Sequence, residues 1–381
     1  MKSRVTTKGS GGSVRNRSRR ATMKGLIFAG AVALLCGASL RAQDADVAVQ
    51  PFLPSPVRSV STIPANGDVN PYGVAFVPPH FPSGGSVNPG DILVSNFNNN
   101  QNLQGTGTTI VRVPPNATPS LFFQGVAPLG LTTALNILAR GFVLVGNFPS
   151  LDGTCGTASP GSVLVINGSG AQVGSIVDPT FINGPWDSAL YDQGSKAKFF
   201  VANGLTGTIA RLNLNVTTGG VVVESATQIA SGYGFQCDPV TFVDAPTGLV
   251  YDPVKDVLYV ASTVDNAVFV VPDAGTATTD HGRGKIIYQD AVHLHGPLAM
   301  AMAPNGHLIV SNNDAINSDP TQPSEIVEFT LGGHFVKQIS VDPNQGGSFG
   351  LAISTHGDAS QFAAVDDNTA MLLIWTLPLL P

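Results

Sequence analysis

The strongest constraint on this chain is a segment that recurs six times along the sequence. Each copy begins with a Pro/Gly step that runs into an apolar stretch, and the copies begin near residues 71, 128, 185, 246, 297 and 348. The interval between copies is 51 to 61 residues. A second apolar run ends in a small or polar residue, a third run follows, and most copies show a fourth. Four short strands in each repeat predict the blades of a β-propeller.

The composition favours the same fold class. The chain holds 43 Gly and 28 Pro in 381 residues, and its Val-, Leu-, Ile- and Phe-rich runs show no long helical period. Such runs, broken by turn residues, are typical of an all-β protein. We therefore predict an all-β, six-bladed β-propeller over residues 57–381. The sixth copy ends after three strands, so we expect residues 57–63 to supply its fourth strand and close the ring.

The first 43 residues have the pattern of an export signal. They carry nine Lys or Arg and no Asp or Glu, and the apolar stretch 25–40 has 16 residues. That is shorter than the roughly 20 residues that span a bilayer. We predict a secretory signal peptide at 1–43, then an extended, proline-rich segment at 44–56. Met23 is an alternative start, and Cys36 an alternative lipid attachment site, although Leu35 occupies a position where that site prefers a small residue.

Removal of this leader makes the chain strongly acidic. It leaves 10 basic residues against 25 acidic ones, a net charge near −15. Such a surface repels phosphate backbones, which argues against a nucleic-acid partner. No further stretch is apolar enough to cross a membrane. We expect a periplasmic or secreted monomer whose partner is an extracytoplasmic protein, a glycan or a small molecule.

Two cysteines, Cys155 and Cys237, follow the leader. An even number in an exported protein favours a disulfide between them, and two buried free thiols are the alternative.

The repeats also resemble a known family. In 246–271, Pro-x-Gly-apolar-x-apolar is followed by a short turn and an apolar-Tyr-Val-Ala run, which is similar to an NHL repeat. The wider group includes the gluconolactonase/regucalcin family and the streptogramin lyases. The resemblance covers about residues 57–377 and implies a six-bladed propeller more than a particular function.

The gluconolactonase resemblance implies a divalent metal at the channel mouth, held by Glu, Asn and Asp. In that family, two ligands come just before the Gly at the start of an inner strand. Here those positions are Tyr72, Leu129, Trp186, Thr247, Leu298 and Phe349. Because none except Thr247, weakly, is a ligand for a hard cation, the family's metal site is not carried over. Tyr72, Trp186 and Phe349 either line an apolar ligand pocket or fill the propeller core.

Loop length indicates which face carries function. The loops from second to third strands, and from each fourth strand to the next blade, share one face, which we call the long-loop face. They include 96–107, 147–161, 233–245, 289–296 and 312–323, and they are rich in Asn, Asp, Gly and Ser. Long loops on a rigid scaffold often carry function, so this face is our candidate working face. Cys155 and Cys237 both fall on it.

Polar residues recur where the second strands end on this face. They are Asn96, Asn147, Asn203, Asn312 and Asp366, with Asp265 just beyond the fourth second strand. A ring of amides and carboxylates is suited to Ca²⁺ or to sugar hydroxyls. The alternative is structural, because Asn and Asp also end strands and cap turns.

Two histidines and two aspartates complete the candidates. His293 and His295 would share a face of an extended segment, a geometry suited to metal binding or catalysis, or they are ordinary loop residues. Asp314 and Asp319 are candidates for a calcium-binding loop, although the EF-hand spacing is absent. We predict no organic cofactor and consider Ca²⁺ or another divalent metal as a ligand.

No sequence motif indicates a particular reaction. The chain has no Gly-x-Ser-x-Gly elbow, His-Glu-x-x-His pair, phosphate-binding loop or dinucleotide fingerprint. Our first hypothesis is a non-enzymatic binding propeller that uses the long-loop face. The alternative is an exported hydrolase or lyase, lactonase-like, with a site at the channel mouth.

Overall fold

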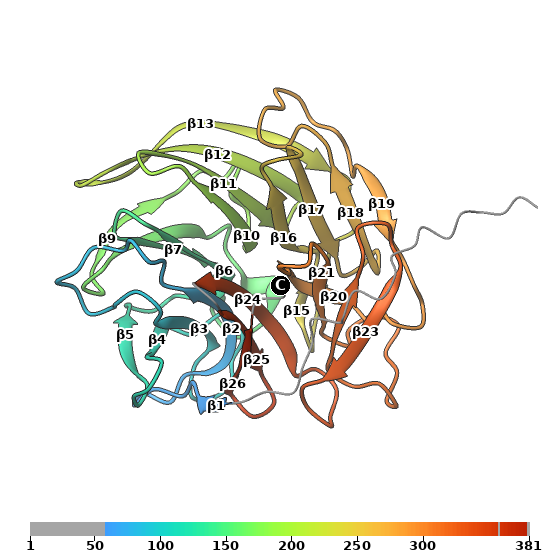
Figure 1. The fold of residues 1–381 in the computed structure, drawn as a ribbon, viewed down its shortest axis with the longest axis horizontal. Coiled ribbons are helices and arrows are strands. Elements are labelled where there is room, and N and C mark those ends of the chain that lie inside the picture. Colours follow the sequence, from blue (N-terminus) through green and yellow to red (C-terminus); the bar gives the residue numbers. More distant parts are fainter. Residues whose placement is uncertain (1–57, 357–358, 379–381) are drawn as a thin grey trace, which may run out of the picture. The chain divides into compact units, whose positions relative to one another are not determined.

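A computed structural model describes residues 58–356 and 359–378, which form six four-stranded antiparallel sheets around a common axis (Figure 1). In each sheet the first strand of the repeat is innermost, and it packs against the inner strands of the two neighbouring sheets. This confirms the prediction of an all-β, six-bladed propeller. The predicted signal peptide and the segment 44–56 lie outside the described residues.

The blades follow one another along the chain. Blade one is β2 (Val69–Phe76), β3 (Ile92–Asn98), β4 (Thr109–Val113) and β5 (Ser120–Gln124). Blade two is β6 (Leu131–Leu138), β7 (Phe142–Asn147), β8 (Ser162–Asn167) and β9 (Gln172–Ile176). Blade three is β10 (Pro185–Asp192), β11 (Lys196–Asn203), β12 (Thr208–Thr217) and β13 (Gly220–Ser231).

The second half of the ring repeats this plan. Blade four is β16 (Pro246–Asp252), β17 (Val257–Ser262), β18 (Ala267–Val271) and β19 (Lys285–Tyr288). Blade five is β20 (Pro297–Met302), β21 (Leu308–Asn312), β22 (Glu325–Phe329) and β23 (Phe335–Ser340). Blade six is β24 (Ser348–His356), β25 (Ala359–Asp366), β26 (Met371–Pro378) and β1 (Arg58–Ser61). Within the described residues, no helix has the length and apolar character needed to cross a bilayer.

The ring is closed by the N-terminal strand, as predicted. β1 pairs antiparallel with β26, with Arg58 opposite Ile374 and Ser61 opposite Met371, and the two lie side by side in Figure 1. Thr62 continues the closure, because its backbone N–H and its hydroxyl both donate to the carbonyl oxygen of Ala370. The Arg58 guanidinium donates to backbone carbonyls of the β4–β5 turn, which joins the closing strand to blade one.

The recurring Pro/Gly step has a steric cause. All six inner strands show a register shift near their start, which is a β-bulge where the strand enters the ring. In five blades the bulge coincides with the recurring step, and in blade two it lies just after the step, between Leu131 and Leu135. A Cβ at Gly248 would lie 2.4 Å from the carbonyl oxygen of Leu298 in the next blade, and one at Gly350 only 1.8 Å from that of Tyr72. Glycine is therefore needed at these two positions, where adjacent inner strands approach closely.

Two elements were not predicted. The long loop before blade four forms a hairpin of β14 (Gln236–Asp238) and β15 (Phe242–Asp244), and the loop after β7 holds a short 3₁₀ helix, η1 (Cys155–Thr157). Cys155 and Cys237 form a disulfide that joins this helix to the hairpin, with Cα atoms 5.5 Å apart. Strands of three residues carry too little alternation to be recognised from sequence.

Six aromatic side chains fill the axis at the long-loop end. They are Tyr72, Phe97, Phe148, Trp186, Phe242 and Phe349, which we call the aromatic plug. Tyr72 stacks on Phe349 with ring centroids 4.6 Å apart, and Phe148 meets Phe242 edge to face at 5.2 Å. Because they come from blades one, two, three and six and from the hairpin, these rings hold distant parts of the ring together.

Deletion of the closing strand is expected to destabilise the propeller. A chain that begins at Pro64 lacks β1 and Thr62, so β26 becomes an open edge and several backbone hydrogen bonds are lost. At about 1 kcal/mol for each bond, the free energy of unfolding falls by roughly 3 kcal/mol or more. Chemical denaturation measures the change. An unaltered midpoint relative to a chain that begins at Val57 would contradict the closure.

A methyl group at the bulge glycine of blade six is expected to disrupt the seam with blade one. Gly350→Ala places a Cβ against the carbonyl oxygen of Tyr72, and the resulting backbone shift costs about 2–3 kcal/mol. Gly174→Ala in β9 is the control, since its Cβ meets nothing closer than 3.7 Å. Equal unfolding midpoints for the two variants would refute the steric account.

Candidate functional site

A central cavity of about 450 Å³ lies between the aromatic plug and the face opposite the long loops. Its walls are the second halves of the six inner strands, and it reaches Pro78 and Asp192 where first strands turn into second strands. We call this end the short-loop face. The volume is in the range of small-molecule sites. The cavity therefore lies toward the short-loop face, whereas loop length had indicated the long-loop face as the working face.

The cavity has one polar wall. Asn136 of β6 donates to the hydroxyl of Ser188 in β10 at 2.7 Å, and the Thr133 hydroxyl donates to the carbonyl oxygen of Trp186. The facing strands β16, β20 and β24 present apolar side chains, among them Leu249, Met300 and Leu351. A cavity that combines apolar side chains with a few grouped polar ones has the character of a small-molecule site.

Asp187 is the most unusual residue of the cavity. Its side chain is buried, and it accepts a hydrogen bond of 2.7 Å from the backbone N–H of Ser188. No basic side chain lines the cavity, and among the described residues none forms a salt bridge with Asp187. Burial raises the pKa of this carboxyl to about 8. At neutral pH, Asp187 is therefore mainly a neutral carboxylic acid that faces the cavity.

The predicted aromatic candidates do not line this cavity. Tyr72, Trp186 and Phe349 are buried in the aromatic plug, which corresponds to the core-filling alternative. Thr247 is also buried, and its hydroxyl donates to the carbonyl oxygen of Leu298 at 2.7 Å. The positions that correspond to the gluconolactonase ligands thus hold packed rings and a bonded hydroxyl, which do not fit a hard cation.

The polar residues at the ends of the second strands are buried and bind backbone. The side-chain amides of three of them donate to backbone carbonyl oxygens. Asn96 donates to the carbonyl oxygen of Thr62, and Asn203 to that of Phe181. Asn312 donates to the carbonyl oxygen of His293. Asn147 instead accepts a bond from the backbone N–H of Gly130. Each of these four contacts joins a second strand to the segment that leads into its own blade, so the fold itself accounts for their repetition.

The last two members of this set also have structural partners. Asp366 accepts a bond from the Thr369 hydroxyl in the turn after β25. Asp265 forms a salt bridge of 3.0 Å with Arg283 and accepts a bond from Ser262. These contacts correspond to the structural alternative for the polar residues at the ends of the second strands.

His293 and His295 do not act as a pair. Residues 291–293 form a turn rather than an extended strand, and the two side chains have different partners. The His293 ring stacks on Phe335, with centroids 3.8 Å apart, and contacts the carboxylate of Asp290. His295 is buried, and its Nδ1 lies 2.9 Å from Oε1 of Glu325.

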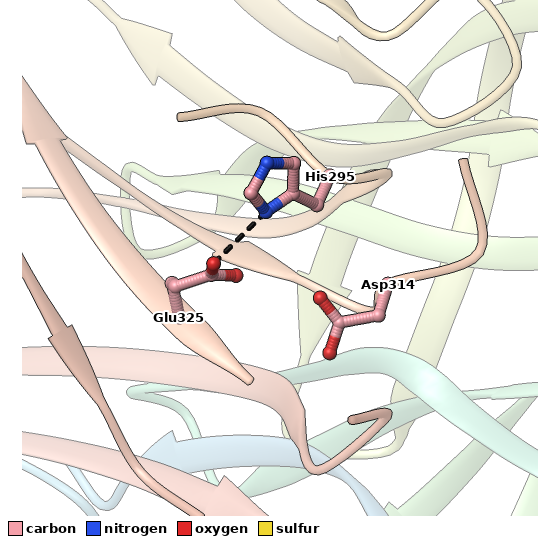
Figure 2. Close-up of side chains that lie close together, drawn as sticks. All are labelled: His295, Asp314 and Glu325. Atoms are coloured by element: carbon pink, nitrogen blue, oxygen red, sulfur yellow. Dashed lines mark hydrogen bonds and ion pairs between the residues drawn. The ribbon is translucent and has the colours of Figure 1, made fainter. Parts of the chain in front are cut away.

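His295, Asp314 and Glu325 form a buried cluster on the long-loop side of blade five (Figure 2). Their nearest donor atoms all lie within 4.8 Å of one another. Burial raises the pKa of Asp314 and of Glu325, whereas the neighbouring His295 lowers both. Asp319, the other predicted calcium ligand, is apart from the cluster and accepts bonds from Thr321 and Gln322 in its own exposed turn.

Sequence reasoning missed Asp187 and Glu325, although the repeats carry a signal for both. Asp187 occupies the bulge position that is Gly73, Thr133, Gly248, Ala299 or Gly350 in the other copies. Glu325 begins a third strand at the position that is Thr109, Ser162, Thr208, Ala267 or Met371 elsewhere. A carboxyl at a position that is otherwise small, neutral or apolar stands out once the six copies are compared.

Comparison with solved structures found similar chains, and one with a TM-score above 0.5 supports the fold. A proposed gluconolactonase is similar at 12% identity with a TM-score of 0.51, over 84% of this chain and 93% of that one. Virginiamycin B lyase from Staphylococcus aureus is similar at 12% identity with a TM-score of 0.48, over 84% and 88%. Regucalcin from Agrobacterium tumefaciens, a calcium-binding protein, is similar at 11% identity with a TM-score of 0.49, over 84% and 94%. At this identity the likeness concerns the six-bladed fold alone.

No protein-family model and no curated protein matches the sequence.

The carboxyl of Asp187 is expected to control how stability depends on pH. Its pKa of about 8 in the folded state exceeds that of an unfolded Asp, near 4, so the folded chain binds a proton more tightly. Wild-type stability therefore falls as pH rises from about 4 to about 8. Asp187→Asn, which cannot ionise, is expected to exceed wild type by roughly 5 kcal/mol at pH 8, about 1.4 kcal/mol for each pKa unit, and to match it near pH 4.

Thermal melts across this pH range measure the difference. Burial and the neighbouring Asp366 also raise the pKa of Asp367 to about 8. Because Asp367 is present in both proteins, the difference between them reports on Asp187 alone. Glu224→Gln on β13, an exposed carboxylate paired with Lys196, is the control. Parallel pH profiles for wild type and Asp187→Asn would show that Asp187 is not a desolvated acid.

Proposed function

We propose that this protein is an exported binding propeller whose central cavity takes up a small organic ligand from the short-loop face. The observation that carries the proposal is Asp187, a buried carboxyl without a basic partner in a cavity of about 450 Å³. A buried acid costs stability, so its presence in an otherwise small-residue position favours a role in binding. The sequence-based expectation was that the ligand binds at the long-loop face. The proposal differs because the aromatic plug separates that face from the cavity.

The lining favours a ligand with a cationic group and an apolar body. Acidic residues are the only charged side chains of the wall, and Asp187 gains a counter-charge when an ammonium group enters. Tyr251, Met300 and Met302 offer aromatic and sulfur-containing surface to the remainder of such a ligand. The proposed ligand class is therefore a small, partly apolar amine.

Export through a signal peptide remains part of the proposal. The basic and then apolar leader supports it, and so does the disulfide between Cys155 and Cys237, because such bonds persist in oxidising compartments. We also propose that the blades are of NHL type, on the Pro-x-Gly pattern of 246–271.

A hydrolase or lyase is the second candidate function, and Asp187 is the observation that favours it. A carboxylic acid that stays protonated near neutral pH has the property of a general acid. A catalyst would convert its ligand, whereas a binding protein would release it unchanged. Mass spectrometry of the ligand after incubation separates the two candidates.

The ligand class is tested by calorimetry with matched probes. We expect 2-phenylethylammonium to bind at least about tenfold more tightly than 2-phenylethanol, since only the amine pairs with the Asp187 carboxylate. Amine affinity should increase as pH rises toward 8, because binding requires loss of the Asp187 proton.

Asp187→Asn should abolish the preference for the amine, and Glu224→Gln on the outer strand β13 should preserve it. Equal binding of amine and alcohol by the wild-type protein would reject the proposed ligand class. If neither probe binds, the cavity does not accept ligands of this size and the binding function fails with it.

A further inference from the structure

Three ligand-type side chains of blade five converge from separate segments. His295 precedes β20, Asp314 lies in the loop after β21, and Glu325 is the first residue of β22. Figure 2 shows the carboxylate of Asp314 pointing toward the carboxylate of Glu325 and the ring of His295. All three residues are buried, with His295 and Glu325 each only 1% exposed. A mixed imidazole and carboxylate set of this kind is not needed to complete a propeller blade.

The cluster contains carboxylate oxygen without a donor. Oδ2 of Asp314 accepts bonds of 2.8 Å from the backbone N–H groups of Ser324 and Gly346, whereas its Oδ1 is buried with no hydrogen-bond partner. Buried acceptors are normally paired, so an unpaired carboxylate oxygen beside a second carboxylate favours a missing positive charge.

The spacing suits a metal ion. Nδ1 of His295 and Oε1 of Glu325 are 2.9 Å apart. Two ligands at right angles, each about 2.1 Å from a cation, are separated by about 3.0 Å. The pair can therefore form one edge of a coordination sphere, with Oδ1 of Asp314 as the third donor. We propose that His295, Asp314 and Glu325 bind a divalent transition-metal cation on the long-loop side of blade five.

The donor set selects the class of ion. Imidazole nitrogen together with carboxylate oxygen suits Zn²⁺ or Mn²⁺, whereas Ca²⁺ and Mg²⁺ prefer oxygen alone. The carboxylates are held in place by surrounding groups, as the two backbone N–H groups hold Asp314 and the Asn312 amide contacts Oε2 of Glu325 at 3.4 Å. Such outer contacts orient ligands before the ion arrives.

A bound ion would join two blades. Asp314 is bonded to Gly346, in the connection from blade five to blade six, so the ion would tie this connection to the start of β20 and to β22. The site lies on the other side of the aromatic plug from Asp187. The inference does not depend on the proposed amine ligand, and either can fail alone.

Metal binding to the full chain tests the proposal directly. The purified protein is stripped with chelator and titrated with Zn²⁺, Mn²⁺, Ca²⁺ or Mg²⁺, with metal content measured by mass spectrometry. We expect one Zn²⁺ or Mn²⁺ for each chain, at affinities at least about tenfold above those for Ca²⁺ and Mg²⁺. A saturating ion is expected to raise Tm by about 5 °C, because it binds only the folded chain.

Variants assign the ion to the cluster. Asp314→Asn and Glu325→Gln should each weaken binding by at least about tenfold, and each should change the visible spectrum of the Co²⁺-loaded protein. The matched controls are Asp319→Asn in the same loop and His293→Asn two residues from His295, which should bind as wild type does. The spectrum of Glu325→Gln decides the assignment if Asp314→Asn fails to fold.

Two results would overturn the proposal. One is a wild-type protein that binds none of these ions and melts at the same temperature with and without chelator. That result is expected if a proton, rather than a metal ion, is shared between the carboxylates of Asp314 and Glu325. The other is binding that falls in Asp319→Asn or His293→Asn as much as in Asp314→Asn, which would place the ion on the exposed loop surface.

Discussion

The packing of six aromatic rings on the propeller axis is the interaction on which the rest of the structure depends. Tyr72, Trp186 and Phe349 reach the axis from inner strands. Phe97 comes from the second strand of blade one, Phe148 from the residue just after that of blade two, and Phe242 from the hairpin before blade four. Their burial joins blades far apart in sequence and closes one end of the axis. The disulfide between Cys155 and Cys237 fastens the hairpin over the same end.

This closed end divides the molecule into two chemically different sides. On the short-loop side, the inner strands leave a cavity whose charged side chains are all acidic. On the long-loop side, the cluster of His295, Asp314 and Glu325 is buried between blade five and its connection to blade six. Both sides hold carboxyls that burial makes costly to ionise, and we propose that a positive charge relieves each cost, from an amine in the first case and a metal ion in the second.

The architecture could be predicted from the sequence because it depends on local and repeated features. Five of the six Pro/Gly steps mark bulges at the ring, and the incomplete sixth copy implies a closing strand, which β1 supplies. The chemistry could not be predicted in the same way. Burial of Asp187 arises only when six inner strands meet, and His295, Asp314 and Glu325 come together only through loops. The strand-end asparagines show the opposite case. They form a repeated sequence pattern that suggested a binding site, whereas their repetition reflects contacts within the fold.

Solvent access to the cavity tests the division into two sides most directly. Ala352→Cys places a thiol on the cavity wall, and Ala245→Cys places one in the buried core beside the plug. The account predicts that a small cationic thiol reagent modifies the folded Ala352→Cys protein, whereas Ala245→Cys reacts only after unfolding. Protection of both thiols would show that the cavity is closed to solvent. Reaction at Ala245→Cys in the folded protein would show that the long-loop end is open, and either result would contradict the account.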